Sequence, residues 1–381
     1  MASSSSSSSG SAEPWIIDAH THVLPERLAR KIRAFFNAVI ADAEGSEVAS
    51  EAAPASVASA SEDVAADAAA PPPHACCPPA AAFDAEYADA DAFPSPGRLV
   101  YPYHESDPKL LAQSLRDAGI KGSWILPYAH KAGVAAPLND AILSVCTALR
   151  SHGQSPIAGL TAHPDDGADA VGAYTRRAIA AGARVAKLHC SVGEYSVLHP
   201  GLAPFWETVA AARVPVVVHA GSHVSGNTAS PEMRDIEEVA RRYPEARVVI
   251  AHSGSPAVKA ALEVARRCGN VYLDTTPTVT RLPLFPPPGH PSHAFTLQLA
   301  RAGRILFGSD VPNVAMRLEE QMAGVVRLFG SDADRAALDA GRDWTELGVS
   351  ERGEGDALGE VFGRAARRLV AGVRVERKAG L

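Results

Sequence analysis

Residues 15–22 read WIIDAHTH, a short apolar run with β-branched side chains that ends in two histidines. Seven further runs of this kind follow, and helical patterns separate them. The runs are GSWILPY (122–128), PIAGLTA (156–162), RVAKLHC (184–190), VPVVVHA (214–220), RVVIAH (247–252), NVYLDTT (270–276) and RILFGSD (304–310). Such alternation of apolar runs with amphipathic helices is typical of βα units and a parallel sheet. The sequence therefore indicates an α/β protein.

The number of units narrows the fold further. Amphipathic spacing predicts helices between the runs, for example within 107–119, 172–183 and 230–244. Eight strand-and-helix units occupy roughly the 250 residues typical of a (β/α)8 barrel. An open nucleotide-binding sheet would have a glycine-rich turn after its first strand, where this chain has His-Thr-His. We predict a (β/α)8 TIM barrel formed by residues 15–40 and 98–381.

Two segments interrupt or precede this pattern. Residues 41–97, after the first strand and its helix, are dominated by Ala, Ser, Pro and acidic residues. So few large apolar side chains cannot offset the entropy of ordering, and we predict a disordered low-complexity insertion. The serine-rich residues 1–14 have neither the basic nor the apolar region of a secretory signal, and we predict a disordered tail.

Composition limits the partners of the chain. It has 381 residues, 46% hydrophobic content and a formal net charge of −7. This balance does not indicate the clustered Lys and Arg that binding to nucleic acid or to an anionic membrane requires. No run approaches the roughly 20 apolar residues that cross a bilayer. We expect a cytoplasmic protein with a small-molecule substrate and no nucleic-acid or membrane partner. The sequence leaves open whether the chain forms a homodimer.

Residue types that bind metals stand at the ends of four predicted strands. His20 and His22 end the first run, and His219, His252 and Asp310 end the fifth, sixth and eighth. The carboxyl ends of barrel strands meet at one mouth, and residues two apart on a strand point the same way. A single histidine at a strand end is more often a hydrogen-bonded structural residue. Five such groups at one rim favour a shared ion.

A family resemblance rests on five motifs, namely IDAHTHVLPE (17–26), KLH (187–189), VVVHAG (216–221), AHSG (251–254) and GSDVP (308–312). Together they resemble the amidohydrolase superfamily, in particular the amidohydrolase 2 branch that includes aminocarboxymuconate-semialdehyde and resorcylate-type decarboxylases. The resemblance runs from Trp15 to the C-terminus, apart from residues 41–97. It implies an enzyme with one divalent metal ion, for which we expect zinc, with manganese or iron as alternatives.

The resemblance also implies roles for single residues. Carried over position by position, the metal ligands are His20, His22, His219 and Asp310. His252 and Asp310 are then catalytic, with His252 next to the metal-bound water or the substrate. We expect Lys187 and His189, two residues apart on the fourth strand, to bind the substrate.

Lys187 has a second interpretation. In binuclear members of the superfamily, a carbamylated lysine at the end of the fourth strand bridges two ions, which here would also draw on His219 and His252. We favour one metal, because the KLH and GSD contexts look like the mononuclear branch.

Three functions remain open at this point. A divalent ion lowers the pKa of bound water toward ~7, which favours a hydrolase acting on a C–N, ester or lactone bond, with Asp310 as proton acceptor. The same residues would serve a decarboxylase, a carbon–carbon lyase that releases carbon dioxide. A barrel that binds metal or ligand without turnover is the alternative from another class. We predict the hydrolase because hydrolysis is the commoner outcome in the superfamily.

Overall fold

The computed structural model describes residues 15–23, 107–220, 233–276, 278, 285–314 and 316–374. The predicted tail (1–14) and the predicted insertion (41–97) lie outside these residues. Every residue to which the sequence assigns a role at the site lies within the described part of the chain.

Eight parallel strands follow one another around the sheet in sequence order. They are β1 (Ile16–Thr21), β2 (Ile120–Ile125), β3 (Ser155–Thr161), β4 (Val185–Leu188), β5 (Pro215–Val218), β6 (Arg247–Ile250), β7 (Val271–Asp274) and β8 (Ile305–Leu306). The last strand returns to the first, since Ala19 N donates to Phe307 O and Asp310 N donates to His20 O, at 2.8 and 2.7 Å. The predicted TIM barrel is confirmed.

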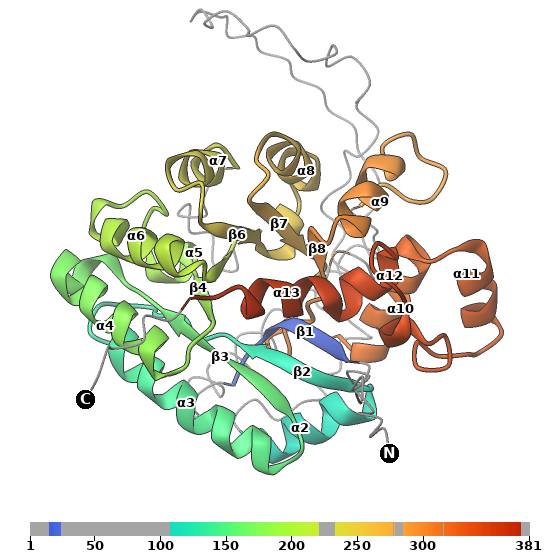
Figure 1. The fold of residues 1–381 in the computed structure, drawn as a ribbon, viewed down its shortest axis with the longest axis horizontal. Helices are drawn as coiled ribbons and strands as arrows, with labels where there is room; N and C mark the ends of the chain where they lie inside the picture. Colours follow the sequence, from blue (N-terminus) through green and yellow to red (C-terminus); the bar gives the residue numbers. More distant parts are fainter. Residues whose placement is uncertain are drawn as a thin grey trace, which may run out of the picture. The chain divides into compact units, whose positions relative to one another are not determined.

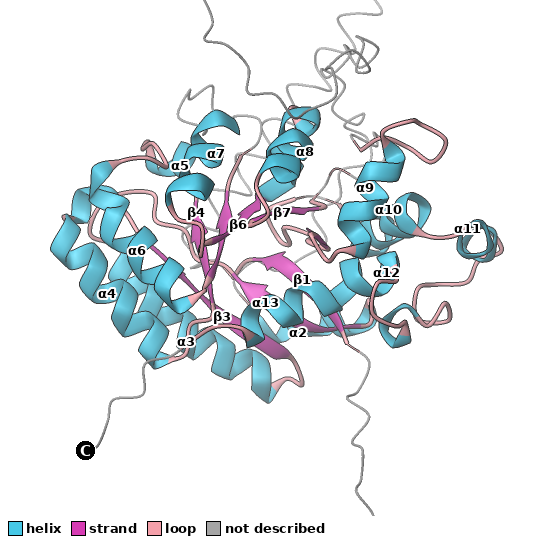
Figure 2. Cartoon of the chain, turned by 45° about the horizontal axis from the view of Figure 1, so that its top comes forward, coloured by secondary structure: helices cyan, strands magenta, loops and turns pink. Residues whose placement is uncertain are grey.

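Helices surround the strands, as Figures 1 and 2 show. The described part of the chain contains the helices α2 (Pro108–Asp117), α3 (Ala135–Ser151), α4 (Ala168–Ala181), α5 (Cys190–Gly193), α6 (Ala203–Ala212), α7 (Met233–Arg242), α8 (Val258–Arg267), α9 (His293–Arg301), α10 (Leu318–Phe329), α11 (Asp332–Asp339), α12 (Ala357–Gly359) and α13 (Ala365–Ala371). The predicted helices within 107–119, 172–183 and 230–244 correspond to α2, α4 and α7.

Alternation along the strands separates two apolar layers. On β5, Val216 and Val218 belong to the layer between strands and helices, whereas Val217 belongs to the cluster inside the barrel. Val185 and Val249 occupy the same interior cluster from neighbouring strands. Successive side chains of a strand point to opposite faces, so the next inward positions beyond this cluster open at the carboxyl ends.

Helix α13 covers the opposite end of the barrel, and Figure 1 shows it crossing in front of the strands. Its residues Ala365, Ala366 and Leu369 pack in the interior cluster. Arg247, the first residue of β6, donates to Leu369 O at 2.6 Å, which places the helix at the amino ends of the strands. Helix α13 therefore packs against the interior cluster from the amino ends of the strands.

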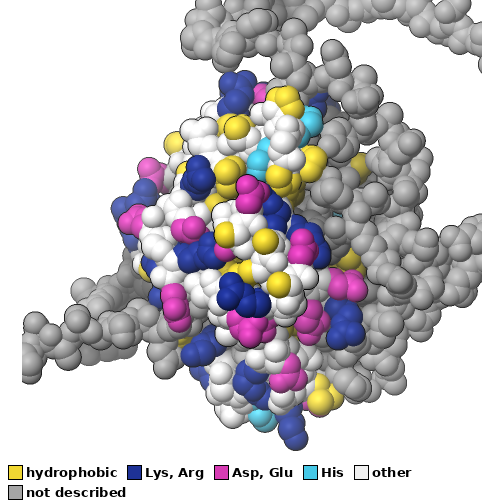
Figure 3. Space-filling view, turned by 90° about the vertical axis from the view of Figure 1, so that its right-hand side faces the viewer, with side chains coloured by type: hydrophobic (Ala, Val, Ile, Leu, Met, Phe, Trp, Pro, Cys, Tyr) yellow, Lys and Arg dark blue, Asp and Glu magenta, His cyan; other side chains and the backbone are white. Residues whose placement is uncertain are grey.

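The described surface carries both signs of charge. Lys and Arg side chains lie among Asp and Glu side chains on the face shown in Figure 3. On α7, Glu237 pairs with Arg241 and Glu238 with Arg242, each at a spacing of four residues. Exposed pairs of this kind contribute little to stability. No helix in the described part combines the length and apolar character needed to cross a membrane.

Candidate metal centre

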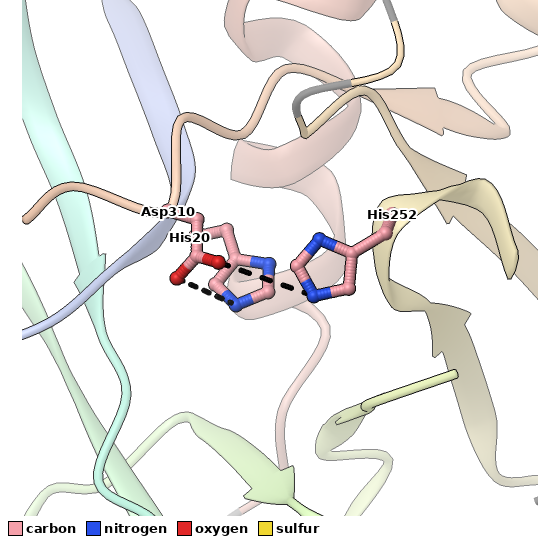
Figure 4. Close-up of side chains that lie close together, drawn as sticks. All are labelled: His20, His252 and Asp310. Carbon is pink, nitrogen blue, oxygen red and sulfur yellow. Dashed lines mark ion pairs between the residues drawn. The ribbon is translucent and has the colours of Figure 1, made fainter. Parts of the chain in front are cut away.

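His20 lies on β1 and His22 directly follows it, and both face the carboxylate of Asp310, which follows β8. Oδ1 of Asp310 lies 3.0 Å from Nε2 of His22 and 3.7 Å from Nε2 of His20. Oδ2 of Asp310 lies 4.0 Å from Nε2 of His252, which approaches from the opposite side, as Figure 4 shows. The donor atoms of His20, His252 and Asp310 lie within 4.8 Å of one another. Strand ends far apart in the sequence therefore meet at one point.

The other ring nitrogen of each histidine is held by the protein. Nδ1 of His22 contacts Leu126 O at 2.6 Å, and Nδ1 of His252 contacts Thr276 O at 3.1 Å. A carbonyl oxygen only accepts, so each Nδ1 carries a proton and donates. In both rings, Nε2 is then the nitrogen directed at the carboxylate.

This arrangement fits a bound cation. Nδ1 of His22 already donates to a carbonyl, so the 3.0 Å contact between its Nε2 and the Asp310 oxygen requires a positive charge, either a proton on Nε2 or a metal ion between the two atoms. Ligand atoms about 2.1 Å from one ion lie roughly 3–3.5 Å apart. The separations for His22 and His20 are close to this spacing, and that of His252 is longer. Neutral imidazole and carboxylate are donors that zinc, manganese and iron accept.

His219 lies behind His252. Nδ1 of His219 is 3.0 Å from Nε2 of His252, and the His189 ring stacks on His219 with centroids 3.8 Å apart. Because Nε2 of His252 has a lone pair, Nδ1 of His219 is the donor. Nε2 of His219 is then a buried acceptor with no hydrogen-bond partner among the described residues, as expected of an atom that binds a ligand outside the protein.

Lys187 brings a buried positive charge to the centre. Its side chain is 1% exposed, and Nζ lies 3.0 Å from Nε2 of His20, to which it donates. Burial lowers the pKa of Lys187 to about 8, while the carboxylates of Asp310 and Asp274 oppose the change. A metal at Nε2 of His20 would use the same lone pair, so the lysine would be released toward other acceptors.

Burial sets the charge state of the imidazoles. It lowers the pKa of His20, His219 and His252 below the ordinary value, and the charge of Lys187 acts in the same direction. Burial alone would raise the pKa of Asp310, but the surrounding histidines outweigh it and hold this pKa well below its usual range. Burial therefore favours the neutral form of His20, His219 and His252 beside an ionised carboxylate, the protonation state that metal binding requires.

Local backbone geometry directs these side chains. His252 and Asp310 have left-handed backbones, with φ of 56° and 58°. A Cβ at Gly308 would lie 2.8 Å from the Cβ of His20, so only glycine lets β1 and β8 approach here. Asp18 accepts from the backbone N–H groups of His20 and Ser309, each at 3.0 Å. Burial raises the pKa of Asp18 to about 7, against the lowering effect of these hydrogen bonds.

The residues assigned from the sequence all lie at this mouth, in two groups. His20, His22, His252 and Asp310 surround one point, and Lys187 contacts it through His20. His219 and His189 form a second layer beside His252.

One further carboxylate, which ends β7, belongs to the centre. Asp274 reaches the mouth, where its Oδ2 accepts from Nδ1 of His20 at 2.8 Å. Sequence reasoning missed Tyr128, whose ring contacts those of His22 and His189. Tyr128 is the last residue of the second apolar run (122–128), and this position could have indicated that it lies at the mouth.

Comparison with known proteins identifies the family. A family model described as amidohydrolase matches residues 17–339, most of the chain. No curated protein sequence matches. Similar solved structures include an uncharacterised TIM-barrel protein from Bordetella bronchiseptica, with 19% identity, 70% of this chain and 84% of that chain covered, and a TM-score of 0.47.

Two decarboxylases are also similar in structure. For a 5-carboxyvanillate decarboxylase from Sphingomonas paucimobilis the values are 12% identity, 69% and 82% coverage and a TM-score of 0.45. For a 2,6-dihydroxybenzoate decarboxylase they are 14%, 68%, 86% and 0.45. Structural likeness at this level carries no argument about activity, so the assignment rests on the family model, which confirms the resemblance found in the motifs. The chain belongs to the amidohydrolase family, whose members are enzymes that bind a divalent metal ion and act on small molecules.

Proposed function

We propose that this chain is a zinc-dependent hydrolase that cleaves a C–N, ester or lactone bond of a small molecule. The observation that supports the proposal is that the Nε2 atoms of His20, His22 and His252 all face one buried carboxylate, that of Asp310. His20, His22, His219 and Asp310 would hold the ion. A divalent ion there supplies Lewis acidity, which makes water acidic enough to lose a proton near neutral pH and polarises a carbonyl.

Asp310 is the proton acceptor in this proposal. Its two oxygens have different surroundings: Oδ1 is contacted by His22, by His20 and by Nδ2 of Asn313, at 3.0, 3.7 and 3.2 Å. Oδ2 faces His252 at 4.0 Å and is the less occupied atom. We assign proton transfer from water to Oδ2, because an oxygen with fewer hydrogen bonds retains more capacity to accept.

His252, Lys187 and His189 would act on the substrate. His252 donates through Nδ1 to the Thr276 carbonyl, which fixes its ring, and it orients the attacking water or stabilises the developing negative charge. Lys187 and His189 would bind the substrate. A released ammonium of Lys187 suits a carboxylate or carbonyl oxygen, because the buried surroundings strengthen that pairing.

Metal analysis tests the first part of the proposal. Protein purified without chelator should contain about one equivalent of divalent metal, and the double variant His20→Ala/His22→Ala should lose it. The double variant His152→Ala/His199→Ala should retain the metal, because His152 follows α3 and His199 accepts from Gly201 N, and neither contacts the centre among the interactions of the described residues. A wild-type protein without metal contradicts the proposal. Two equivalents, together with a carbamate on Lys187, would establish the binuclear alternative.

A substrate screen tests the reaction. Amides, esters and lactones are incubated beside aromatic carboxylic acids, while hydrolysis and carbon dioxide release are followed in parallel. Hydrolysis that disappears on metal removal supports the proposed reaction. Metal-dependent carbon dioxide release without hydrolysis would instead establish the decarboxylase, which uses the same residues.

A further inference from the structure

Asp274, at the carboxyl end of β7, connects two residues of the metal centre through its two oxygens. It is 1% exposed. Oδ2 accepts from Nδ1 of His20 at 2.8 Å, and Oδ1 accepts from the backbone N–H of His252 at 2.7 Å. One buried carboxylate thus contacts both the first strand and the turn that follows β6.

Three donors from the described residues surround Oδ1. Besides the N–H of His252, the N–H of Thr276 approaches at 3.2 Å and its hydroxyl at 2.7 Å. The two backbone groups have no capacity to accept. Whatever side chain stands at position 274 must present an acceptor on this side or leave buried donors without partners, which costs free energy.

The opposite oxygen determines where His20 carries its proton. A carboxylate accepts, so Nδ1 of His20 is protonated and Nε2 holds the lone pair. The contact at Nε2 agrees, because Nζ of Lys187 donates to it at 3.0 Å. Nε2 is also the nitrogen that faces Asp310, at 3.7 Å. The tautomer imposed by Asp274 is the one that leaves the inward nitrogen free for a ligand.

Asp274 also holds the turn that presents His252. This turn, η4 (Ala251–Gly254), has left-handed backbones at His252 and Ser253, with φ of 56° and 47°. Such conformations are unfavourable for residues other than glycine. The Asp274 side chain accepts from His252 N, and its backbone carbonyl accepts from the Ser253 hydroxyl. Both bonds favour the turn in the conformation that aims His252 at the mouth.

We propose that Asp274 is a positioning residue that selects the metal-binding tautomer of His20 and fixes the turn of His252. Its effect on metal affinity rests on the function proposed above; its effect on the tautomer does not. Carboxylates behind a ligating histidine commonly fix its ring and strengthen binding.

The variant Asp274→Asn tests the proposal with little change in side-chain size. The donors around Oδ1 require the amide oxygen on their side, so the amide NH2 group must face Nδ1 of His20. Nδ1 then accepts, and the proton moves to Nε2, the nitrogen directed at Asp310. An Asp-to-Asn change next to a histidine can select the wrong tautomer in this way.

Two readouts are compared in metal-free protein and with zinc. Proton–nitrogen correlation spectra of histidine-labelled apoprotein report the tautomer, with the His20 signal identified by its loss in His20→Ala. We expect the Nδ1–H form in the wild type and the Nε2–H form in Asp274→Asn. Zinc affinity, measured by competition with a chromophoric chelator, should fall by about 10–100-fold.

Glu360→Gln is the matched control. Glu360 is likewise a buried carboxylate, but it pairs with Arg368 of α13, at the amino ends of the strands. This change should lower stability and leave both the tautomer and zinc affinity unchanged. Retention of the Nδ1–H form in Asp274→Asn, or an equal loss of affinity in the control, would overturn the proposal. Absence of zinc binding in the wild type would contradict the proposed function, while the tautomer still decides the role of Asp274.

Discussion

The variant Ser309→Ala tests the contact that joins the first and last strands. The hydroxyl of Ser309 donates to the buried carboxylate of Asp18 and accepts from the N–H of Val311 at 3.1 Å. Above its raised pKa of about 7, Asp18 is ionised; at such a pH, losing a hydrogen bond to it costs ~1.5–3 kcal/mol, and leaving the Val311 donor unsatisfied costs ~1–3 kcal/mol. The backbone N–H of Ser309 still donates to Asp18. We expect the free energy of unfolding to fall by about 3–5 kcal/mol.

Ser123→Ala provides the matched comparison. Ser123 is fully buried on β2, opposite Asp18, and its hydroxyl makes no hydrogen bond among the described residues. Removing it costs no such bond, so stability should change by less than about 1 kcal/mol. Urea unfolding of both variants, followed by fluorescence and circular dichroism with chelator present, excludes any contribution from metal. Equal losses in the two variants would refute the importance of this contact.

Three further predictions concern packing and pH. Leu369→Ala, inside the barrel on α13, should lower the free energy of unfolding by about 2–5 kcal/mol and leave the metal content unchanged, as measured by urea unfolding and metal analysis. Hydrogen bonds from the Arg352 guanidinium hold the pKa of Asp334 well below its usual range, so this pair stabilises the fold above the unfolded-state value of about 4. The stability difference between wild type and Asp334→Asn should be constant above about pH 5 and narrow in more acidic urea titrations; a constant difference down to pH 2 would contradict the assignment. A Cβ at Gly159 would overlap a backbone carbonyl of β2, so Gly159→Ala should lower the melting temperature, and an unchanged value would disprove this contact.

The barrel fold and the identity of the residues at the carboxyl ends of the strands were predictable from the sequence, because both follow from patterns among neighbouring residues. Apolar runs and helical spacing depend on neighbours along the chain, and all eight predicted strands are present. In a parallel barrel the carboxyl ends must converge, so residues such as His22 and Asp310 could be expected to meet, although 288 positions separate them in number. The family motifs, which are also local, pointed to the same enzyme family that the family model identifies.

The finer arrangement of the centre was decided by tertiary structure. Val249 and Ala251 point into the barrel, so simple alternation does not direct His252 inward; a left-handed turn does. The bonds from Asp274 to His20, and from Lys187 to the same ring, depend on the twist and register of the whole barrel, to within a fraction of an ångström. Sequence determines which residues reach the mouth, because side-chain alternation and strand order are properties of the chain. Which nitrogen of His20 carries the proton is a property of its surroundings, and those exist only once the barrel has closed.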